Sequence, residues 1–146
     1  MTMTTETTQT DIQIRQLIEA HTQAICTKNL DQIMAHYAAD IVIFDLKPPL
    51  ILKGIDACRH LWETGLPCMS DLAGMEQQEL NVTIDGHLAV AYWIFRFTGL
   101  KPDHPAAQIW LRITAVCQRQ QDDWQIVHEH VSMPFAPENS GDRAQL

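Results

Sequence analysis

The pair Asp85-Gly86 constrains the fold of this chain more than any other feature of its sequence. Apolar and polar residues alternate from Leu80 to Ile84, and a long apolar run from His87 to Thr98 follows the pair. An Asp-Gly pair between two such runs is a strong signal for a tight turn between antiparallel strands. The sequence therefore predicts a β-hairpin in the second half of the chain.

Other segments also have the composition of strands. Residues 108–119 and 124–133 are two further apolar runs. An earlier β-branched run, residues 40–46, stops at Lys47-Pro48-Pro49, because proline cannot donate a hydrogen bond to a sheet. Residues 50–53 can form a short return strand.

Three segments have the spacing of helices. Apolar residues recur every three or four positions over residues 10–25, and His21 lies on the same stripe, so it is expected to point at the core. A second, short helix is expected over residues 29–39, with Asn29 as its cap. Residues 54–62 predict a third helix.

Together these segments predict an α+β domain in which three N-terminal helices pack on one face of a curved, mostly antiparallel mixed sheet. We expect residues 10–136 to form this single domain, because a chain of 146 residues leaves little room for a second core. Residues 1–9 and 137–146 are polar and are expected to be disordered tails.

The charge balance argues against some classes of partner. The formal net charge of −8 does not favour binding to nucleic acid or to an anionic membrane surface. The sequence contains no recognisable secretory signal or membrane-spanning run, and its four cysteines are widely spaced among apolar residues. We expect a cytoplasmic protein with free thiols and without a zinc ribbon or disulfide framework.

The last strand contains a row of polar side chains. Because side chains alternate between the two faces of a strand, every second residue is expected on the same side. A regular strand therefore groups Trp124, Ile126, His128, His130 and Ser132. The two imidazoles and the hydroxyl would form a polar floor, which either binds a ligand or consists of core groups that satisfy one another.

Three motifs together resemble a known family. They are Tyr37-Ala38-Ala39-Asp40 leading into Asp45-Leu46-Lys47-Pro48-Pro49-Leu50, Trp110-x-Arg112-x-Thr114, and Trp124-x-Ile126-x-His128-Glu129-His130-x-Ser132-x-Pro134-Phe135. With them the chain resembles the SnoaL-like branch of the nuclear transport factor 2-like superfamily, which includes ketosteroid isomerase. The resemblance implies a cone-shaped domain whose helices and concave sheet enclose one pocket, usually as a homodimer, but it does not imply one reaction.

The resemblance also implies roles for individual residues. Asp45 falls where ketosteroid isomerase keeps the carboxylate that moves the proton, and His21 falls where it keeps a tyrosine as the first oxyanion-hole donor. The region around Arg112 and Thr114 falls where the isomerase keeps a second donor, a carboxylic acid. Because His21 and the Arg112 region differ from the isomerase, the resemblance implies the site and not steroid isomerisation.

Each candidate also has a structural interpretation. Asp45 can be a general base in an apolar cavity, or it can cap the turn before Pro48. His21 can donate to an enolate, or it can be a core histidine bonded to a carbonyl group. His128 and His130 can line the pocket, or they can bind a metal ion with His21 or Asp45, although no stronger zinc signature accompanies them.

Two arginines, Arg96 and Arg112, lie on predicted strands. The residues that flank them on the same faces are Tyr92, Ile94, Trp110 and Thr114. A buried guanidinium needs an acceptor, so each arginine is expected to bind a ligand carboxylate or enolate, or to pair with an acidic residue such as Asp45 or Glu79.

The opposite sheet face is expected to form a homodimer interface. Its residues are Leu111, Ile113, Ala115, Val127 and Val131. Helices cover only one side of a sheet, so a second apolar side indicates a partner surface.

We therefore expect a small-molecule pocket protein, and first an enzyme that needs no cofactor. Asp45 would take a proton next to a carbonyl group while His21 and His130 stabilise the enolate, as in isomerase, cyclase or dehydratase chemistry. The expected ligand contacts are Tyr92, Arg96, Trp110, Arg112, Thr114, His128 and Ser132. The alternative is a non-catalytic binding and dimerisation domain that recognises a small carboxylate.

Overall fold

A computed structural model describes residues 5–137 and has the α+β class that the sequence predicts. The first half contains α1 (Thr5–Cys26), α2 (Leu30–Ala35), β1 (Tyr37–Phe44), β2 (Leu52–Lys53), α3 (Ile55–Gly65) and the 3-10 helix η1 (Leu66–Met69). The second half contains β3 (Gly74–Asp85), β4 (Leu88–Thr98), β5 (Leu111–Gln120) and β6 (Asp123–Ser132).

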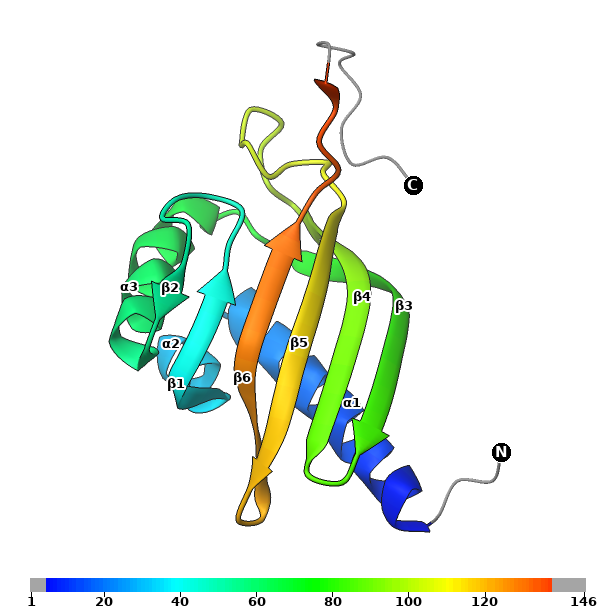
Figure 1. Ribbon diagram of the computed structural model, residues 1–146. Helices are drawn as coiled ribbons and strands as arrows, with labels where there is room; N and C mark the ends of the chain where they lie inside the picture. Colours follow the sequence, from blue (N-terminus) through cyan, green and yellow to red (C-terminus); the bar gives the residue numbers. More distant parts are fainter. Residues whose placement is uncertain (1–4, 138–146) are drawn as a thin grey trace.

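The six strands form one mixed sheet in the order β2-β1-β6-β5-β4-β3 (Figure 1). β3 and β4 form the predicted hairpin, in which Asp85 pairs with Leu88 and Gly86 has a φ of 61°. β1 and β6 are parallel, whereas the other neighbouring strands are antiparallel. The parallel pair brings the end of β1 next to the last part of β6, although the two segments are far apart in the sequence.

The helices cover one face of the sheet. Figure 1 shows α1 crossing behind the strands, with no helix over the face that is turned toward the viewer. The buried side chains of α1 are those of the predicted stripe, together with Thr10: Ile14, Ile18, His21, Ala24 and Ile25. Ile41 and Ile43 of β1 are fully buried against them, so the core lies between the helices and the covered face of the sheet.

Some boundaries differ from the predicted ones. α1 begins at Thr5, within the segment expected to be a disordered tail, and the predicted tail residues 1–4 and 138–146 lie outside the described residues. α2 ends at Ala35 rather than near residue 39, because Tyr37 already pairs with Ile126 of β6. Within residues 5–137, no helix combines the length and the apolar character needed to cross a membrane.

A β-bulge in β6 changes which side chains point inward. Val116 of β5 pairs with His128 and the next residue, Cys117, pairs with Ile126, so Val127 is an extra residue in β6. Ile126 is buried before the bulge, and Glu129 is buried after it. The predicted grouping of Trp124, Ile126, His128, His130 and Ser132 on one face is therefore wrong, because it assumed a strand of unbroken period two.

Candidate active site

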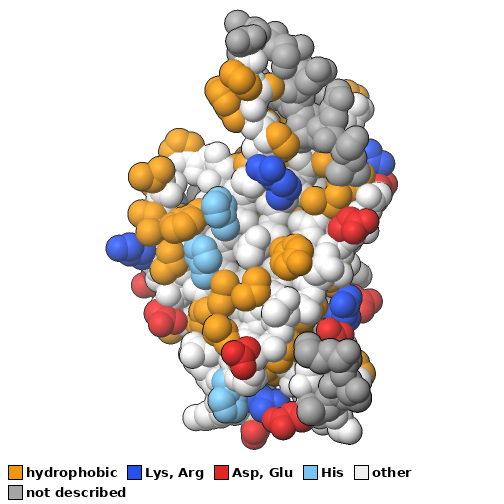
Figure 2. Space-filling view, turned by 45° about the vertical axis from the view of Figure 1, so that its right-hand side comes forward, with side chains coloured by type: hydrophobic (Ala, Val, Ile, Leu, Met, Phe, Trp, Pro, Cys, Tyr) orange, Lys and Arg blue, Asp and Glu red, His pale blue; other side chains and the backbone are white. Residues whose placement is uncertain are grey.

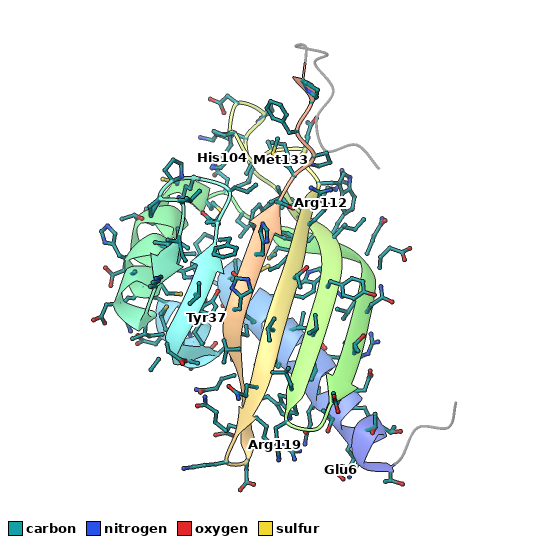
Figure 3. The ribbon with its side chains drawn as sticks, in the orientation of Figure 1. Glu6, Tyr37, His104, Arg112, Arg119 and Met133 are labelled. Atoms are coloured by element: carbon teal, nitrogen blue, oxygen red, sulfur yellow. The ribbon has the colours of Figure 1, made fainter. Side chains whose placement is uncertain are left out.

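A cavity of about 710 Å³ lies between the helices and the covered face of the sheet. Its wall is mostly apolar and aromatic: Ile25, Leu61, Trp62, Met69, Trp93, Phe95, Phe97, Leu111, Ile113, Val131 and Met133. His104 lines it as well, and Figure 3 shows His104 and Met133 at the same end of the domain. A cavity of this size and lining suits a small, largely apolar molecule.

Asp45 lines the cavity from the position just after β1. Ile41 and Ile43 of β1 are buried, and Asp45 continues this inward-pointing series one step beyond the strand. Its side chain is half-buried, so it has contact with both the cavity and solvent. The expected general base is thus at the cavity wall and not in a surface turn away from it.

Glu129 is the second cavity carboxyl, and the sequence reasoning missed it. Its side chain is 7% exposed and lines the cavity beside the end of β1, where it pairs with Ile43. Burial, and then the nearby charge of Asp45, raises the pKa of Glu129 to about 7, although the hydrogen bond from Tyr37 acts in the opposite direction. The available signal for a buried carboxyl was a glutamate two residues from both Val127 and Val131, which are apolar. A strand without the bulge places Glu129 on the face opposite to His128 and His130, and that face was not expected to line the cavity.

The hydroxyl of Tyr37 joins several groups at this end of the cavity. Trp62 donates through Nε1 to the Tyr37 oxygen at 3.3 Å, and His21 Nε2 lies 3.1 Å from the same oxygen. The Tyr37 hydroxyl reaches the two carboxyl oxygens of Glu129 at 3.4 and 3.5 Å. Tyr37 is buried and its pKa is well above the usual range, mainly because of burial, so it remains a neutral hydroxyl.

His21 lines the cavity, and both of its ring nitrogens have partners. Nε2 contacts the Tyr37 hydroxyl, and Nδ1 lies 2.9 Å from Nδ1 of His36. Burial, and then the charge that His36 can carry, lowers the pKa of His21 to about 3, so His21 is neutral near neutral pH. Because its nitrogens are already engaged, His21 can donate to an enolate only by giving up one of these contacts.

Most of the predicted ligand contacts lie on the uncovered face of the sheet instead. Directly paired residues share a face, and the pairs Tyr92–Thr114, Thr114–His130 and Phe44–His130 form one row across the sheet. Arg112 pairs with Ser132 in the next row, and His128 pairs with Val116. Figure 2 shows this face obliquely, with histidine and hydrophobic side chains next to one another.

None of these residues lines the cavity, so their predicted positions on the cavity side were wrong. The corrected residues are Tyr92, Arg112, Thr114, His128, His130 and Ser132. The physical reason is that the apolar face of β5, which contains Leu111, Ile113 and Ala115, is the buried one. The predicted dimer surface that used these three residues and Val131 was therefore assigned to the wrong side.

The two arginines have partners outside the cavity. Arg96 forms a bidentate ion pair with Glu76 at 2.9 and 3.0 Å, and its guanidinium lies 5.1 Å from the ring centre of Trp110. Arg112 donates through Nε to the hydroxyl of Ser132 at 3.2 Å. Neither arginine pairs with Asp45 or Glu79, and neither arginine nor Trp110 lines the cavity. The structure therefore gives no support to the expectation that these arginines bind the carboxylate of a ligand in the cavity.

The histidines of β6 do not share a site with His21 and Asp45. His128 Nδ1 lies 2.8 Å from the carbonyl oxygen of Val42, and the ring of Phe44 packs edge-on against both His128 and His130. Neither histidine lines the cavity, so the structure does not bring them together with His21 and Asp45 as the metal hypothesis requires. Among residues 5–137, no group of three or more His, Cys, Asp or Glu side chains is arranged to hold a metal ion.

The chain is similar to known proteins over most of its length. The profile of the SnoaL-like domain family matches residues 14–136. An NTF2-like protein of unknown function from Pseudomonas putida KT2440 is 36% identical, with a TM-score of 0.79 and coverage of 90% of this chain and 91% of that chain. No match to a functionally curated protein was found.

Two solved structures of lower identity share the fold. A proposed dehydratase of the NTF2-like family from Streptomyces avermitilis has 16% identity and a TM-score of 0.71, with 89% of this chain and 100% of that chain covered. A proposed ketosteroid isomerase from Shewanella frigidimarina has 19% identity and a TM-score of 0.68, with coverage of 80% and 92%.

Proposed function

The chain belongs to the SnoaL-like domain family, and we propose that it is an enzyme which moves a proton next to the carbonyl group of a small, largely apolar molecule. The observation that carries this proposal is the pair of carboxyls, Asp45 and Glu129, in the wall of an otherwise apolar cavity. The reaction needs no cofactor, because these side chains can supply both the base and the acid.

The two carboxyls have different surroundings, and this difference gives them different roles. The half-buried Asp45 takes the proton from the carbon next to the carbonyl group, as a carboxylate with access to both ligand and solvent. Glu129 is buried, and with a pKa of about 7 it is protonated in a large share of molecules near neutral pH. In that form it can donate a hydrogen bond to the oxygen on which negative charge develops.

This assignment changes the part of the site that stabilises the enolate. Glu129 replaces His21 as the proposed donor, because both ring nitrogens of His21 are already engaged. His130 has no part in the reaction, since it lies on the other face of the sheet. Isomerase, cyclase and dehydratase reactions all share this proton-transfer step.

The aromatic side chains in the cavity wall favour a flat substrate that contains rings. The side chains of Trp62, Trp93, Phe95 and Phe97 all line it, and aromatic rings pack well against other planar groups. A cavity of about 710 Å³ has room for a ligand of two or three fused rings.

The test is hydrogen exchange next to the carbonyl of a probe ketone in heavy water. We expect the protein to accelerate deuterium uptake by α-tetralone, a bicyclic aromatic ketone, and Asp45→Asn to reduce this rate by roughly 100-fold or more. Asp40→Asn is the matched control, because Asp40 is an exposed aspartate of β1. If wild-type protein bound the ketone without accelerating exchange, or if Asp45→Asn exchanged as fast as Asp40→Asn, the proposal would be wrong.

We also propose a homodimer through the uncovered face of the sheet. Helices leave this face open, and it exposes large side chains, with Tyr92 47% and Phe44 37% exposed. Sedimentation analysis should show a dimer for the wild type and a monomer for Tyr92→Arg. Ile12→Arg is the control, because Ile12 on α1 is 50% exposed and should leave the dimer intact. A wild-type monomer would refute this interface.

A further inference from the structure

We propose that His36, His21 and Tyr37 form a proton relay that connects the carboxyl of Glu129 with solvent outside the cavity. The use of this relay in a reaction rests on the proposed function. Its existence can be tested without any substrate, so the two proposals can fail separately.

The four side chains form a continuous series of contacts. His36 Nδ1 lies 2.9 Å from His21 Nδ1, and His21 Nε2 lies 3.1 Å from the Tyr37 oxygen. The Tyr37 hydroxyl then reaches both oxygens of Glu129, at 3.4 and 3.5 Å. This last contact is long for an O–H···O hydrogen bond, so it is the weakest link of the series.

One arrangement of hydrogens satisfies every contact when Glu129 is ionised. Tyr37 must donate to the carboxylate, so its oxygen accepts from Trp62 Nε1 and from His21 Nε2. A neutral His21 carries only one ring hydrogen, so its Nδ1 accepts from His36 Nδ1. All donors along the chain then point toward Glu129.

A second arrangement satisfies the same contacts when Glu129 is protonated. The carboxylic acid now donates to the Tyr37 oxygen, which still accepts from Trp62. The Tyr37 hydroxyl donates to His21 Nε2, and His21 Nδ1–H donates to His36 Nδ1. All donors along the chain now point away from Glu129, and no contact is lost.

Passage of one proton converts the first arrangement into the second. A solvent proton binds Nε2 of His36, and the hydrogen on His36 Nδ1 moves to His21 Nδ1. The hydrogen on His21 Nε2 moves to the Tyr37 oxygen, and the hydroxyl hydrogen of Tyr37 moves to Glu129. One proton enters, one proton arrives, and both histidines and the tyrosine are neutral again.

The outer end of the relay is open to solvent. His36 is the half-buried residue that follows α2, and it does not line the cavity. Among residues 5–137, Arg119 Nε is the single buried side-chain nitrogen or oxygen that lacks a hydrogen-bond partner. Within that range His36 Nε2 has no hydrogen-bond partner and is not one of the buried atoms that lack one, so this nitrogen is accessible to solvent.

The route matters because its outer end, His36, and its inner link, Tyr37, lie outside the cavity wall, although His21 between them lines it. A ligand that fills the cavity covers Glu129, which is already 7% exposed, and separates it from solvent on that side. Tyr37 and His36 do not line the cavity, and both ring nitrogens of His21 are directed at these two residues, so a ligand in the cavity leaves the contacts in place. Glu129 can then regain a proton while the ligand is still bound.

Three ionisable side chains near Glu129 affect its pKa or are affected by its charge, and only one of them, Asp45, is charged near neutral pH. Asp45 approaches from the end of β1, Cys58 from α3 and Cys117 from β5. Burial, followed by the charge of Glu129, raises the pKa of each thiol to about 12, so both thiols stay neutral. Asp45 is therefore the neighbour whose charge Glu129 feels, and Asp45→Asn provides a variant in which that charge is absent.

The experiment is a pH titration of the full-length protein by ¹⁵N NMR of the histidine rings, together with ¹³C NMR of the glutamate carboxyls. We expect the two ring nitrogens of His21 to shift in opposite directions as one tautomer replaces the other, with the same midpoint, near pH 7, as Glu129. Protonation of His21 would instead move both nitrogens toward the protonated value.

Two variants make the result specific. In Tyr37→Phe the chain is interrupted, so Glu129 should still titrate while the His21 tautomer no longer follows it. In Glu129→Gln the pH-dependent change of the His21 tautomer should disappear. If Tyr37→Phe does not fold, this second variant still tests whether the His21 tautomer follows the titration of Glu129. A single His21 tautomer across the Glu129 titration in the wild type, or unchanged coupling in Tyr37→Phe, would overturn the relay.

Discussion

Replacing Glu129 by glutamine should remove a pH dependence of stability that the buried carboxyl creates. The pKa of Glu129 rises from the ordinary 4.5 to about 7 in the folded protein. Between these values the folded protein holds a proton that the unfolded chain has released, so stability falls as the pH rises. At about 1.4 kcal/mol per pKa unit, this loss amounts to about 3 kcal/mol.

His21 contributes a pH dependence of stability that has the opposite sign. The unfolding free energy of the wild type, measured against pH, is therefore not sufficient to isolate the contribution of Glu129. Its pKa is lowered from 6.5 to about 3, so below 6.5 the unfolded chain binds a proton that the folded protein does not. The His21 contribution to stability is therefore present above pH 6.5 and is lost as the pH falls toward 3. Both proteins contain His21, so subtracting the unfolding free energy of Glu129→Gln from that of the wild type at each pH cancels the His21 contribution.

The assay is urea unfolding of the wild type and Glu129→Gln at a series of pH values across the interval from 4.5 to about 7. We expect the wild type to lose about 3 kcal/mol relative to Glu129→Gln across this interval. Glu19→Gln is the control for the substitution itself, because Glu19 is an exposed glutamate on α1. A constant difference for Glu129→Gln, or one that grows toward low pH, would refute the reasoning.

Two further expectations concern a glycine and a thiol. Gly99 has a φ of +86°, and an added Cβ would lie 2.6 Å from Cβ of Ala73, so Gly99→Ala should destabilise the protein by about 3 kcal/mol in urea unfolding. Gly65→Ala is its control, because Gly65 has open space around it; it should change stability by less than about 1 kcal/mol, and equal effects would contradict the strain. Cys68 is exposed and lines the cavity, so a thiol reagent should modify it well before the buried Cys117, and α-tetralone should slow the reaction. Modification at equal rates, seen by mass spectrometry of peptides, would contradict this.

Much of the fold follows from local sequence signals. The Asp85-Gly86 turn and the apolar stripe of α1 lie in the structure where the sequence predicts them, because both depend on neighbouring residues alone. The end of α2 was harder to predict, since Tyr37 is drawn into β1 by pairing with Ile126, a residue distant in sequence.

The site could be predicted only in part, and the bulge at Val127 is the reason. His21 reaches the cavity because α1 keeps a regular helical period, and Asp45 reaches it because the last part of β1, from Ile41 onward, alternates regularly. β6 does not, and one extra residue moves His130 to the uncovered face and brings Glu129 inward. Which strand residue is extra depends on the register with β5, and this register is not visible in the sequence of β6 alone.

The most direct test of the proposed acid is the pKa of Glu129 itself, measured by ¹³C NMR of its carboxyl carbon in the wild type and in Asp45→Asn. We expect a wild-type midpoint near pH 7 and a lower midpoint in Asp45→Asn, because the charge of Asp45 contributes to the raised pKa. A wild-type midpoint near the ordinary 4.5 would mean that Glu129 is a plain carboxylate at neutral pH. It could then neither donate to an enolate nor receive a proton through Tyr37, and the proposed chemistry of the cavity would be contradicted.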